Sequence, residues 1–274
     1  MKIRLIALDF DGTLLNEEKK LSEGNREAIE ECLARGIYII PATGRTASGI
    51  PGFIREIPGI RYAILTNGAK VMDLQENKII SQELIDWELA RKILTFLSDF
   101  PVAYDPYVEG RGKMEARFRD HLENYGVPPV MRQMVRSTRD EVEDEIQLLS
   151  QRRCAVEKIN VFTADRKLRQ DLWNQLSSCA RIKVTSSLEY NLEINAASAT
   201  KGEGLARLAG YLGIRMEETM ACGDGTNDLS MIQAAGIGVA MENAMDAVKE
   251  QADYITLSNE HDGVAAAIRR FALN

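Results

Sequence analysis

Short apolar runs alternate with amphipathic stretches over the first third of the chain. A run that is nearly all apolar and rich in branched side chains predicts a strand buried on both faces. Between the first two such runs, residues 22–35 repeat apolar side chains at helical spacing, beginning at the potential N-cap Ser22 and ending before Gly36. The predicted strands are residues 3–8, 37–41 and 62–65.

The last third of the chain repeats this alternation. Strands and helices that alternate at both ends of a chain predict a parallel sheet that is covered by helices on both faces. The predicted strands here are residues 219–222, 238–241 and 254–257, and the predicted helices are residues 202–212, 229–235 and 244–251.

The middle of the chain lacks strict alternation and is typical of an α+β module. We therefore expect an α/β fold in which residues 1–83 and 191–274 build a doubly wound parallel-sheet core, with residues 84–190 as an inserted α+β domain. The elements predicted in the insert are helices at 87–97 and 138–152, a polar loop at 105–112, and strands at 159–162 and 182–185 with a helix between them.

Composition and charge narrow the functional classes. The 274 residues are 45% apolar and 27% charged, which is ordinary for a soluble globular protein and long enough for two domains. The net charge of -7 argues against nucleic acid or an anionic membrane as a partner. An anionic substrate would therefore need a local group of cations or a metal ion.

Cysteine and histidine are too sparse for several kinds of site. The four cysteines form no Cys-x-x-Cys pair, and the two histidines are far apart in the sequence, so zinc sites, disulfide frameworks and Ser-His-Asp catalysis have little support. We expect no signal peptide, because the first apolar run is short and is broken by Asp9 and Asp11, and no stretch of the sequence is apolar over a membrane-spanning length. We expect a reduced, cytoplasmic, soluble protein.

Two carboxylates, Asp9 and Asp11, follow the first predicted strand directly. Ligands bind at the carboxyl ends of strands in parallel α/β sheets, and an ionised carboxylate there needs a partner or a metal. Gly12 lets the chain turn sharply, so that both acids can face one point. The competing interpretation is a solvated turn, because Asp-Gly is a common turn pair.

A second acidic group, Asp224, Asn227 and Asp228, follows the strand at 219–222. A helix cap would explain one of these residues but not all three. Carboxylates without histidine or cysteine favour a hard cation, and Mg²⁺ takes one or two carboxylates together with phosphate and water.

Two further motifs fit a phosphate ligand. Thr43-Gly44-Arg45 lies at the end of the second strand, where a hydroxyl and turn N–H groups can bind phosphate oxygens, although a simple turn is the alternative. Lys201 lies at a helix start, where a cation opposes the helix dipole unless it faces an anion. A solvated lysine is the competing interpretation.

In order and spacing, these motifs resemble those of the haloacid dehalogenase-like hydrolase superfamily. The position of the insert, its α+β pattern and the segment Asn67-Gly68-Ala69 resemble the Cof-type phosphatases with a type IIB cap. The resemblance extends over nearly the whole chain but is only topological in the insert. It implies a Rossmann-like core, a cap for substrate specificity, and Mg²⁺-dependent hydrolysis of small phosphorylated metabolites, with sugar phosphates favoured.

The resemblance also implies roles for single residues. Asp9 would be the nucleophile, and Asp11 the general acid and later the base. The dehalogenase branch of the superfamily expels halide and needs no proton donor. A general acid at Asp11 would therefore separate this chain from that branch. The implied metal site is Asp9, Asp11 through its backbone carbonyl, Asp224 and Asp228, with Asp228 orienting Lys201 or a metal-bound water. The implied catalytic or phosphate-binding residues are Thr43, Gly44, Arg45, Lys201 and Asn227.

Other interpretations stay open from the sequence. A phosphomutase or phosphotransferase would use the same aspartyl-phosphate with another acceptor, and a non-catalytic sensor could share the fold. The P-loop pattern and the Gly-x-Gly-x-x-Gly pattern are absent, which disfavours an NTPase and a dehydrogenase. Arg111 and Lys113, in a Gly-flanked loop, are candidates for reading the leaving group, with a solvated loop as the alternative.

Overall fold

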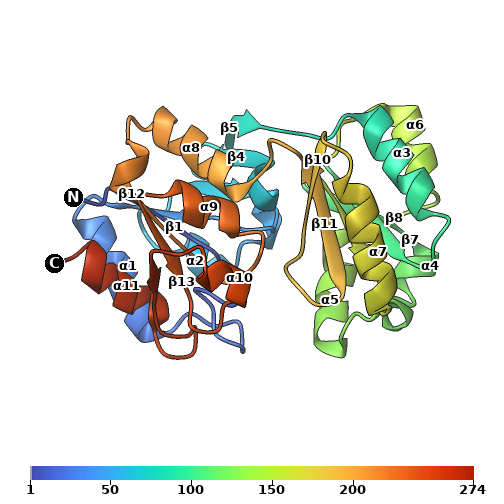
Figure 1. Cartoon of the computed structure of the whole chain (residues 1–274). Helices are drawn as coiled ribbons and strands as arrows, with labels where there is room; N and C mark the ends of the chain where they lie inside the picture. The colour runs from blue at the N-terminus through green and yellow to red at the C-terminus, as the bar shows by residue number, and fades with distance from the viewer. Residues whose placement is uncertain (1) are drawn as a thin grey trace. The chain divides into compact units, whose positions relative to one another are not determined.

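The structure is a computed structural model that describes residues 2–274. The chain forms two compact units. The core unit contains residues up to 82 together with 200–274, so it takes the blue and cyan and the orange and red segments of Figure 1. The cap unit contains residues 83–199. Within the described residues, no helix is long and apolar enough to cross a membrane.

A five-stranded parallel sheet forms the centre of the core unit. Its strand order is β14-β13-β12-β1-β2, so β1 from the N-terminus lies beside β12 from the last third of the chain. The predicted parallel sheet is therefore confirmed, although β14 is shorter than expected. The strands are β1 (Leu5–Leu8), β2 (Tyr38–Pro41), β12 (Thr219–Gly223), β13 (Ile237–Ala240) and β14 (Tyr254–Ile255).

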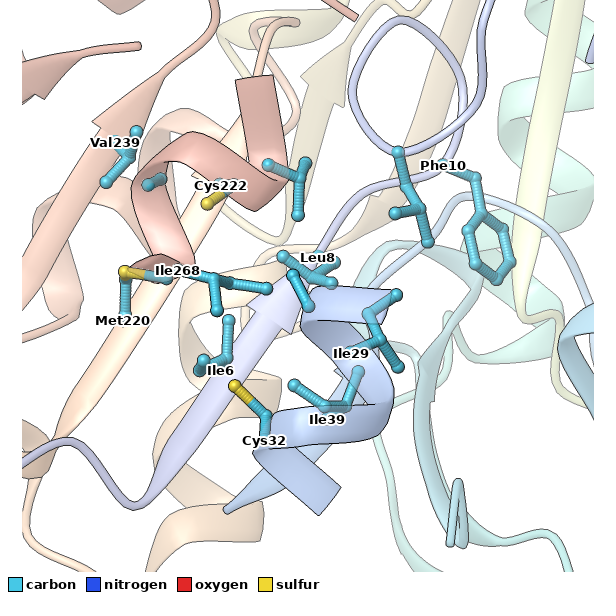
Figure 2. Packing of buried hydrophobic residues seen from close by; sticks show 14 of the residues in the cluster. Ile6, Leu8, Phe10, Ile29, Cys32, Ile39, Met220, Cys222, Val239 and Ile268 are labelled. Carbon is cyan, nitrogen blue, oxygen red and sulfur yellow. The ribbon is translucent and has the colours of Figure 1, made fainter. Parts of the chain in front are cut away.

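Alternate residues of β1 face two apolar layers, which is why its sequence is apolar throughout. Ile6 and Leu8 belong to the layer that contains Ile29 of α1 and Ile268 of α11, as Figure 2 shows. Leu5 and Ala7 belong to the opposite layer, with side chains of α8 and α9. Helices on both faces thus hold the sheet edge where the acidic motifs begin.

The helices of the core unit follow the predicted order. Ser22 caps the first one, because its hydroxyl accepts the N–H of Asn25. The predicted helix at 244–251 is reduced to one short turn of helix. The helical segments are α1 (Glu23–Ala34), η1 (Ala47–Gly49), α2 (Gly52–Arg55), η2 (Thr66–Gly68), α8 (Lys201–Tyr211), η4 (Met216–Glu218), α9 (Leu229–Ala234), α10 (Asp246–Lys249) and α11 (Gly263–Phe271).

The predicted strand at 62–65 is present, but it belongs to a second, antiparallel sheet. This strand, β3 (Tyr62–Leu65), pairs with β4 (Lys70–Asp73), which pairs with β5 (Lys78–Gln82). A single parallel bridge from Ile64 to Ala42 links β3 to the segment after β2. The end of β3 therefore lies near the end of β2, which matters for the site.

The cap unit is an α+β module with a six-stranded sheet of order β10-β11-β9-β6-β7-β8. The expected return to the core at residue 191 is wrong, because β11 starts there and pairs with β9 and β10. The strands are β6 (Ala103–Val108), β7 (Arg111–Glu115), β8 (Arg139–Val142), β9 (Lys158–Phe162), β10 (Ile182–Thr185) and β11 (Asn191–Ala196). The helical segments are α3 (Trp87–Leu97), α4 (Ala116–Arg119), η3 (Leu122–Tyr125), α5 (Pro129–Thr138), α6 (Glu145–Arg152) and α7 (Arg166–Ser177).

Two expectations for the cap are wrong for one physical reason. The supposed loop at 105–112 is the hairpin of β6 and β7, and the first part of the supposed helix at 138–152 is strand β8. Both segments carry charged side chains that look solvated in the sequence. In the structure, Asp105 and Arg139 are buried and form an ion pair, so these polar residues belong to a sheet face.

A buried pair of carboxyl groups connects β7 to α6. Glu145, the first residue of α6, is fully buried, and one of its oxygens accepts the backbone N–H of Glu115 at 2.7 Å. Burial, and next the hydrogen bond with the Glu115 side chain, raise the pKa of Glu145 to about 9. Arg117 forms an ion pair with Glu115 at 2.5 Å. Glu145 is therefore the member of the pair that carries a proton near neutral pH.

We expect Glu145→Gln to stabilise the protein increasingly as the pH rises. The folded pKa of Glu145 lies above its ordinary value of 4.5, so the folded state keeps a proton that the unfolded state has lost. This contribution is complete below about pH 4.5 and is lost as the pH approaches 9. Glutamine has no such proton to lose. Thermal unfolding at pH 5, 7 and 9 should show a growing difference in Tm between variant and wild type.

The exposed Glu143→Gln is the matched control for this measurement, because it changes the same charge on the adjoining segment. Its Tm difference from the wild type should stay nearly constant with pH. A pH-independent difference for Glu145→Gln as well would show that Glu145 is not held protonated.

Candidate active site

The predicted motif residues gather at one edge of the core unit. Asp9 directly follows β1, Thr43 lies two residues past β2, and Asp224 directly follows β12. These three strand ends meet at the carboxyl edge of the parallel sheet, where doubly wound folds bind ligands. The structure thus brings together segments from opposite ends of the chain.

Lys201 joins the acidic motifs. Its ammonium nitrogen donates to Oδ1 of Asp9 at 2.7 Å and to Oδ1 of Asp228 at 2.5 Å. The lysine is fully buried at the first position of α8, which Thr200 caps by accepting the N–H of Glu203. Burial opposes the charged form, but Asp228 and Asp9 outweigh it and raise the pKa of Lys201 above its ordinary value. Lys201 is therefore a permanent cation in the site, not a solvated lysine.

Three carboxylates surround this one cation. Oxygens of Asp9, Asp224 and Asp228 lie within 4.8 Å of one another. Burial raises the pKa of Asp9 well above its ordinary value, with Lys201 opposing the shift. Burial, and next the charge of Asp228, raise the pKa of Asp224 to about 7. When its three carboxylates are ionised, the cluster holds more negative charge than Lys201 compensates, and its oxygen ligands suit a hard divalent cation such as Mg²⁺.

Asp228 differs from the other two acids in its contacts. Its Oδ1 accepts from Lys201, and its Oδ2 accepts the backbone N–H groups of Asp224 and Gly225. Both oxygens are thus engaged by protein groups. These contacts favour the expected orienting role of Asp228 toward Lys201 over direct coordination of a metal.

Gly12 and Thr13 shape the space around Asp224. Gly12 has φ +84°, and a Cβ at this position would lie 2.3 Å from Oδ2 of Asp224. Only glycine therefore lets the chain pass this carboxylate. The Thr13 hydroxyl donates to Oδ1 of Asp224 at 2.7 Å. The sequence motif contained Thr13, but no role was expected for it.

Asp11 is held by two cations. Arg45 donates to its carboxylate through Nε at 3.0 Å and through an amino group at 2.7 Å, and Lys19 lies 3.0 Å from it. Burial alone would raise the pKa of Asp11, but the charges of Arg45 and Lys19 outweigh it and lower the pKa. Arg45, which the resemblance places at the phosphate, contacts Asp11 in the structure. Lys19 was missed, because its loop shows no pattern in the sequence.

Thr43 and Asn227 lie among the same residues. The Thr43 hydroxyl accepts the N–H of Arg45 at 3.1 Å, which is the turn contact that the sequence allowed as an alternative, and Gly44 lies within this turn. The hydroxyl proton can still be donated to a ligand. Asn227 donates through Nδ2 to Oδ1 of Asn67 at 3.3 Å. Asn67, in a left-handed conformation at φ 57° after β3, is thus part of the site.

Comparison with known proteins agrees with this geometry. A family model described as haloacid dehalogenase-like hydrolase matches residues 6–268. The chain belongs to this family. A Bacillus subtilis member, 5-amino-6-(5-phospho-D-ribitylamino)uracil phosphatase YcsE, is 33% identical to it over 99% of this chain and 96% of its own.

Solved structures of the haloacid dehalogenase-like hydrolases share the whole architecture. One such hydrolase from B. subtilis matches with a TM-score of 0.85 and 30% identity, covering 97% of this chain and 99% of its own. The subclass IIB sugar phosphatase BT4131 matches with a TM-score of 0.83 and 25% identity, covering 98% of both chains. The protein is therefore a Cof-type phosphatase of this superfamily with a type IIB cap.

We expect Lys201→Met to lower the free energy of unfolding by about 3–5 kcal/mol in EDTA, because it leaves buried carboxylates without their cation. Urea denaturation followed by circular dichroism measures this loss. Lys20→Met is the matched control, since Lys20 pairs with Glu18 at the surface and should change stability by about 0.5 kcal/mol or less. A loss below about 1 kcal/mol for Lys201→Met would contradict a structural charge balance in the site.

Proposed function

We propose that this phosphatase is Mg²⁺-dependent and hydrolyses small phosphorylated metabolites through an aspartyl-phosphate on Asp9. The observation that carries the proposal is the buried ammonium of Lys201 between Asp9 and Asp228, within a cluster of three carboxylates. A carboxylate nucleophile beside a fixed cation suits phosphoryl transfer, because the cation offsets charge on the equatorial oxygens.

In the first step, a carboxylate oxygen of Asp9 forms a bond to phosphorus while the bond from phosphorus to the leaving alcohol breaks. Lys201 stabilises the negative charge of the phosphoryl oxygens, together with the Thr43 hydroxyl. Asp11 gives its proton to the alcohol oxygen. Because Arg45 and Lys19 lower the pKa of Asp11, Asp11 must take up this proton in the substrate complex.

In the second step, Asp11 accepts a proton from water as the water oxygen attacks phosphorus, and Asp9 leaves as a carboxylate. Asp228 keeps Lys201 in place throughout, since it holds both the ammonium and the loop that carries Asp224. Asp9, Asp224 and the backbone carbonyl of Asp11 would hold Mg²⁺, whose charge lets a carboxylate approach a phosphate dianion.

The relatives guide the choice of substrates. One relative is named for 5-amino-6-(5-phospho-D-ribitylamino)uracil, and a structural neighbour is a sugar phosphatase. Each name describes a substrate in which a phosphate is attached to a hydroxyl-rich molecule. We propose that this chain acts on a substrate of that kind, with the cap selecting it, in the cytoplasm and without a nucleic-acid or membrane partner. A panel of sugar and polyol phosphates that includes the ribitylaminouracil phosphate tests this choice.

We expect Asp9→Asn to reduce phosphate release by at least about 1,000-fold, because an amide cannot serve as the nucleophile. Release of inorganic phosphate from p-nitrophenyl phosphate and from the panel measures this loss. Acid quenching followed by intact-mass analysis should show a phosphorylated chain for the wild type and none for the variant.

The exposed Asp171→Asn on α7 is the matched control and should keep full activity. Near-normal turnover by Asp9→Asn would contradict the covalent mechanism. If the wild type forms an isomer of its substrate without releasing phosphate, the protein is a mutase instead of a hydrolase.

Removal of divalent ions with EDTA should abolish turnover, and Mg²⁺ should restore it. Asp224→Asn should need at least about 10-fold more Mg²⁺ for half-maximal activity, because one ligand oxygen loses its charge. Mg²⁺ should also raise the Tm of the wild type more than that of the variant, a readout that does not depend on turnover. Full activity in EDTA would contradict the metal requirement, and Asp171→Asn again serves as the control.

A further inference from the structure

A tight turn at residues 16–20 follows the first acidic motif of the core unit. A short antiparallel bridge closes it, and the backbone carbonyl of Asn16 accepts the N–H of Lys19 at 2.9 Å. Lys19 has φ 61°, so its backbone is left-handed. Its ammonium lies 3.0 Å from Oδ1 of Asp11. The turn thus brings a cation back to the motif that precedes it.

The left-handed backbone of Lys19 is unfavourable for a lysine. Side chains other than those of asparagine and aspartate rarely adopt this region, and glycine adopts it without strain. The ion pair with Asp11 adds little stability in return, because the Lys19 side chain is 50% exposed and that of Asp11 is 40% exposed. A strained residue that contacts a reacting group points to a role in function.

The carboxylate of Asp11 is held from two directions. Arg45, which follows β2, donates to Oδ2 through Nε at 3.0 Å and to Oδ1 through an amino group at 2.7 Å. Lys19 approaches Oδ1 from the turn that follows β1. A forked arginine contact fixes the plane of a carboxylate. A second cation from another segment then limits the movement of the whole pair.

The basic residues that the sequence singled out in the cap have other partners. Arg111 and Lys113 both pair with Asp140, inside the cap unit. Lys19 instead contacts a motif residue of the core unit directly. Its contact is therefore the one that can act on the reaction through Asp11.

We propose that Lys19 is a positioning residue that holds the carboxyl group of Asp11 in place for proton transfer. The inference rests on the proposed function, since it takes Asp11 as the acid of the first step and the base of the second. A carboxyl group with its proton on Oδ2 still accepts at Oδ1, so the contact from Lys19 can persist through both steps. Proton transfer depends on orientation, so a loosened Asp11 slows both of them.

Lys19→Met and Lys20→Met test this role by the same change at neighbouring positions. The measured quantity is the ratio of kcat/KM for ribitol 5-phosphate to kcat/KM for p-nitrophenyl phosphate. The alcohol needs a proton as it leaves, whereas nitrophenolate needs little. We expect Lys19→Met to lower the ratio about 5- to 10-fold and Lys19→Arg to restore most of it. Lys20 pairs with Glu18, so Lys20→Met should leave the ratio unchanged.

The same change in an Asp11→Asn background shows whether Lys19 acts through Asp11. Asp11→Asn alone should lower the ratio, and adding Lys19→Met should lower it no further, because the two residues act as a unit. Acid quenching during turnover of p-nitrophenyl phosphate gives a second readout. The phosphorylated fraction of the chain should be larger for Lys19→Met than for the wild type, since the step that needs the base is slowed.

Lys19→Gly separates positioning from folding. Glycine adopts the left-handed turn without strain, so we expect the Tm to rise by about 1–3 °C while the ratio falls as in Lys19→Met. Arg153→Gly is the matched control, because Arg153 is an exposed basic residue with φ 49° at the end of α6. Its ratio should stay unchanged.

An unchanged or higher ratio for Lys19→Met would overturn the proposal, because Lys19 would then act on Asp11 by its charge or not at all. An equal loss on both substrates with a Tm several degrees lower would overturn it as well, by showing a structural role. If Asp11→Asn lowers the ratio and Lys19→Met does not, the inference fails and the proposed function stands. An unchanged ratio for Asp11→Asn would instead contradict the acid step of the proposed function, and the inference with it.

Discussion

The buried ammonium of Lys201 is the interaction on which the site depends. It joins residue 9, at the end of the first strand, to residue 228, beyond the end of β12. Charges of this kind are stable inside a protein only when they compensate one another. The five-stranded sheet supplies the geometry, because its parallel order puts β1 beside β12 and so brings both carboxylates to one edge.

Cations fixed close to the site also explain how an acidic protein can bind an anionic substrate. The net charge of -7 repels phosphate at long range, so attraction must come from fixed cations at short range. The structure divides its cations by task. Lys201 contacts Asp9, whereas Arg45 and Lys19 hold Asp11. When all three carboxylates are ionised, two of their negative charges are left over after Lys201, and one divalent ion can compensate them.

Buried charged groups are compensated differently in the cap unit. In the core, Asp9, Asp228 and Lys201 are buried together in one acidic cluster. In the cap, the buried ion pairs of Asp105 with Arg139 and of Glu193 with Lys158 are each neutral, and Oδ1 of Asp105 has no hydrogen-bond partner. The pair of Glu115 and Glu145 is a third arrangement, in which Arg117 pairs with Glu115 and burial raises the pKa of Glu145 so that it keeps a proton. Each arrangement joins segments that are distant in sequence.

Sequence by itself determined the parallel core and most of the site. Continuous apolar runs have one stable place in an α/β protein, the two-sided sheet, and acids directly after such runs must lie at its edge. Asp9 and Asp224 were identifiable for that reason, and Lys201 because a cation at a helix start opposes the helix dipole unless it faces an anion. Only the tertiary structure decided which partners they have: Arg45 binds Asp11, and Asp228 holds Lys201.

The sequence predicted the elements of the cap less well than those of the core. Hydrophobic periodicity identifies a strand when one face is apolar and the other is solvated, or when both faces are apolar. The strands β6 and β8 instead carry buried charges, which look like a loop or an exposed helix until their partners are known. Asp105 and Arg139 are 34 residues apart and stabilise each other only after the sheet has formed. Pairing at that distance is a property of the fold, so tertiary structure alone could decide it.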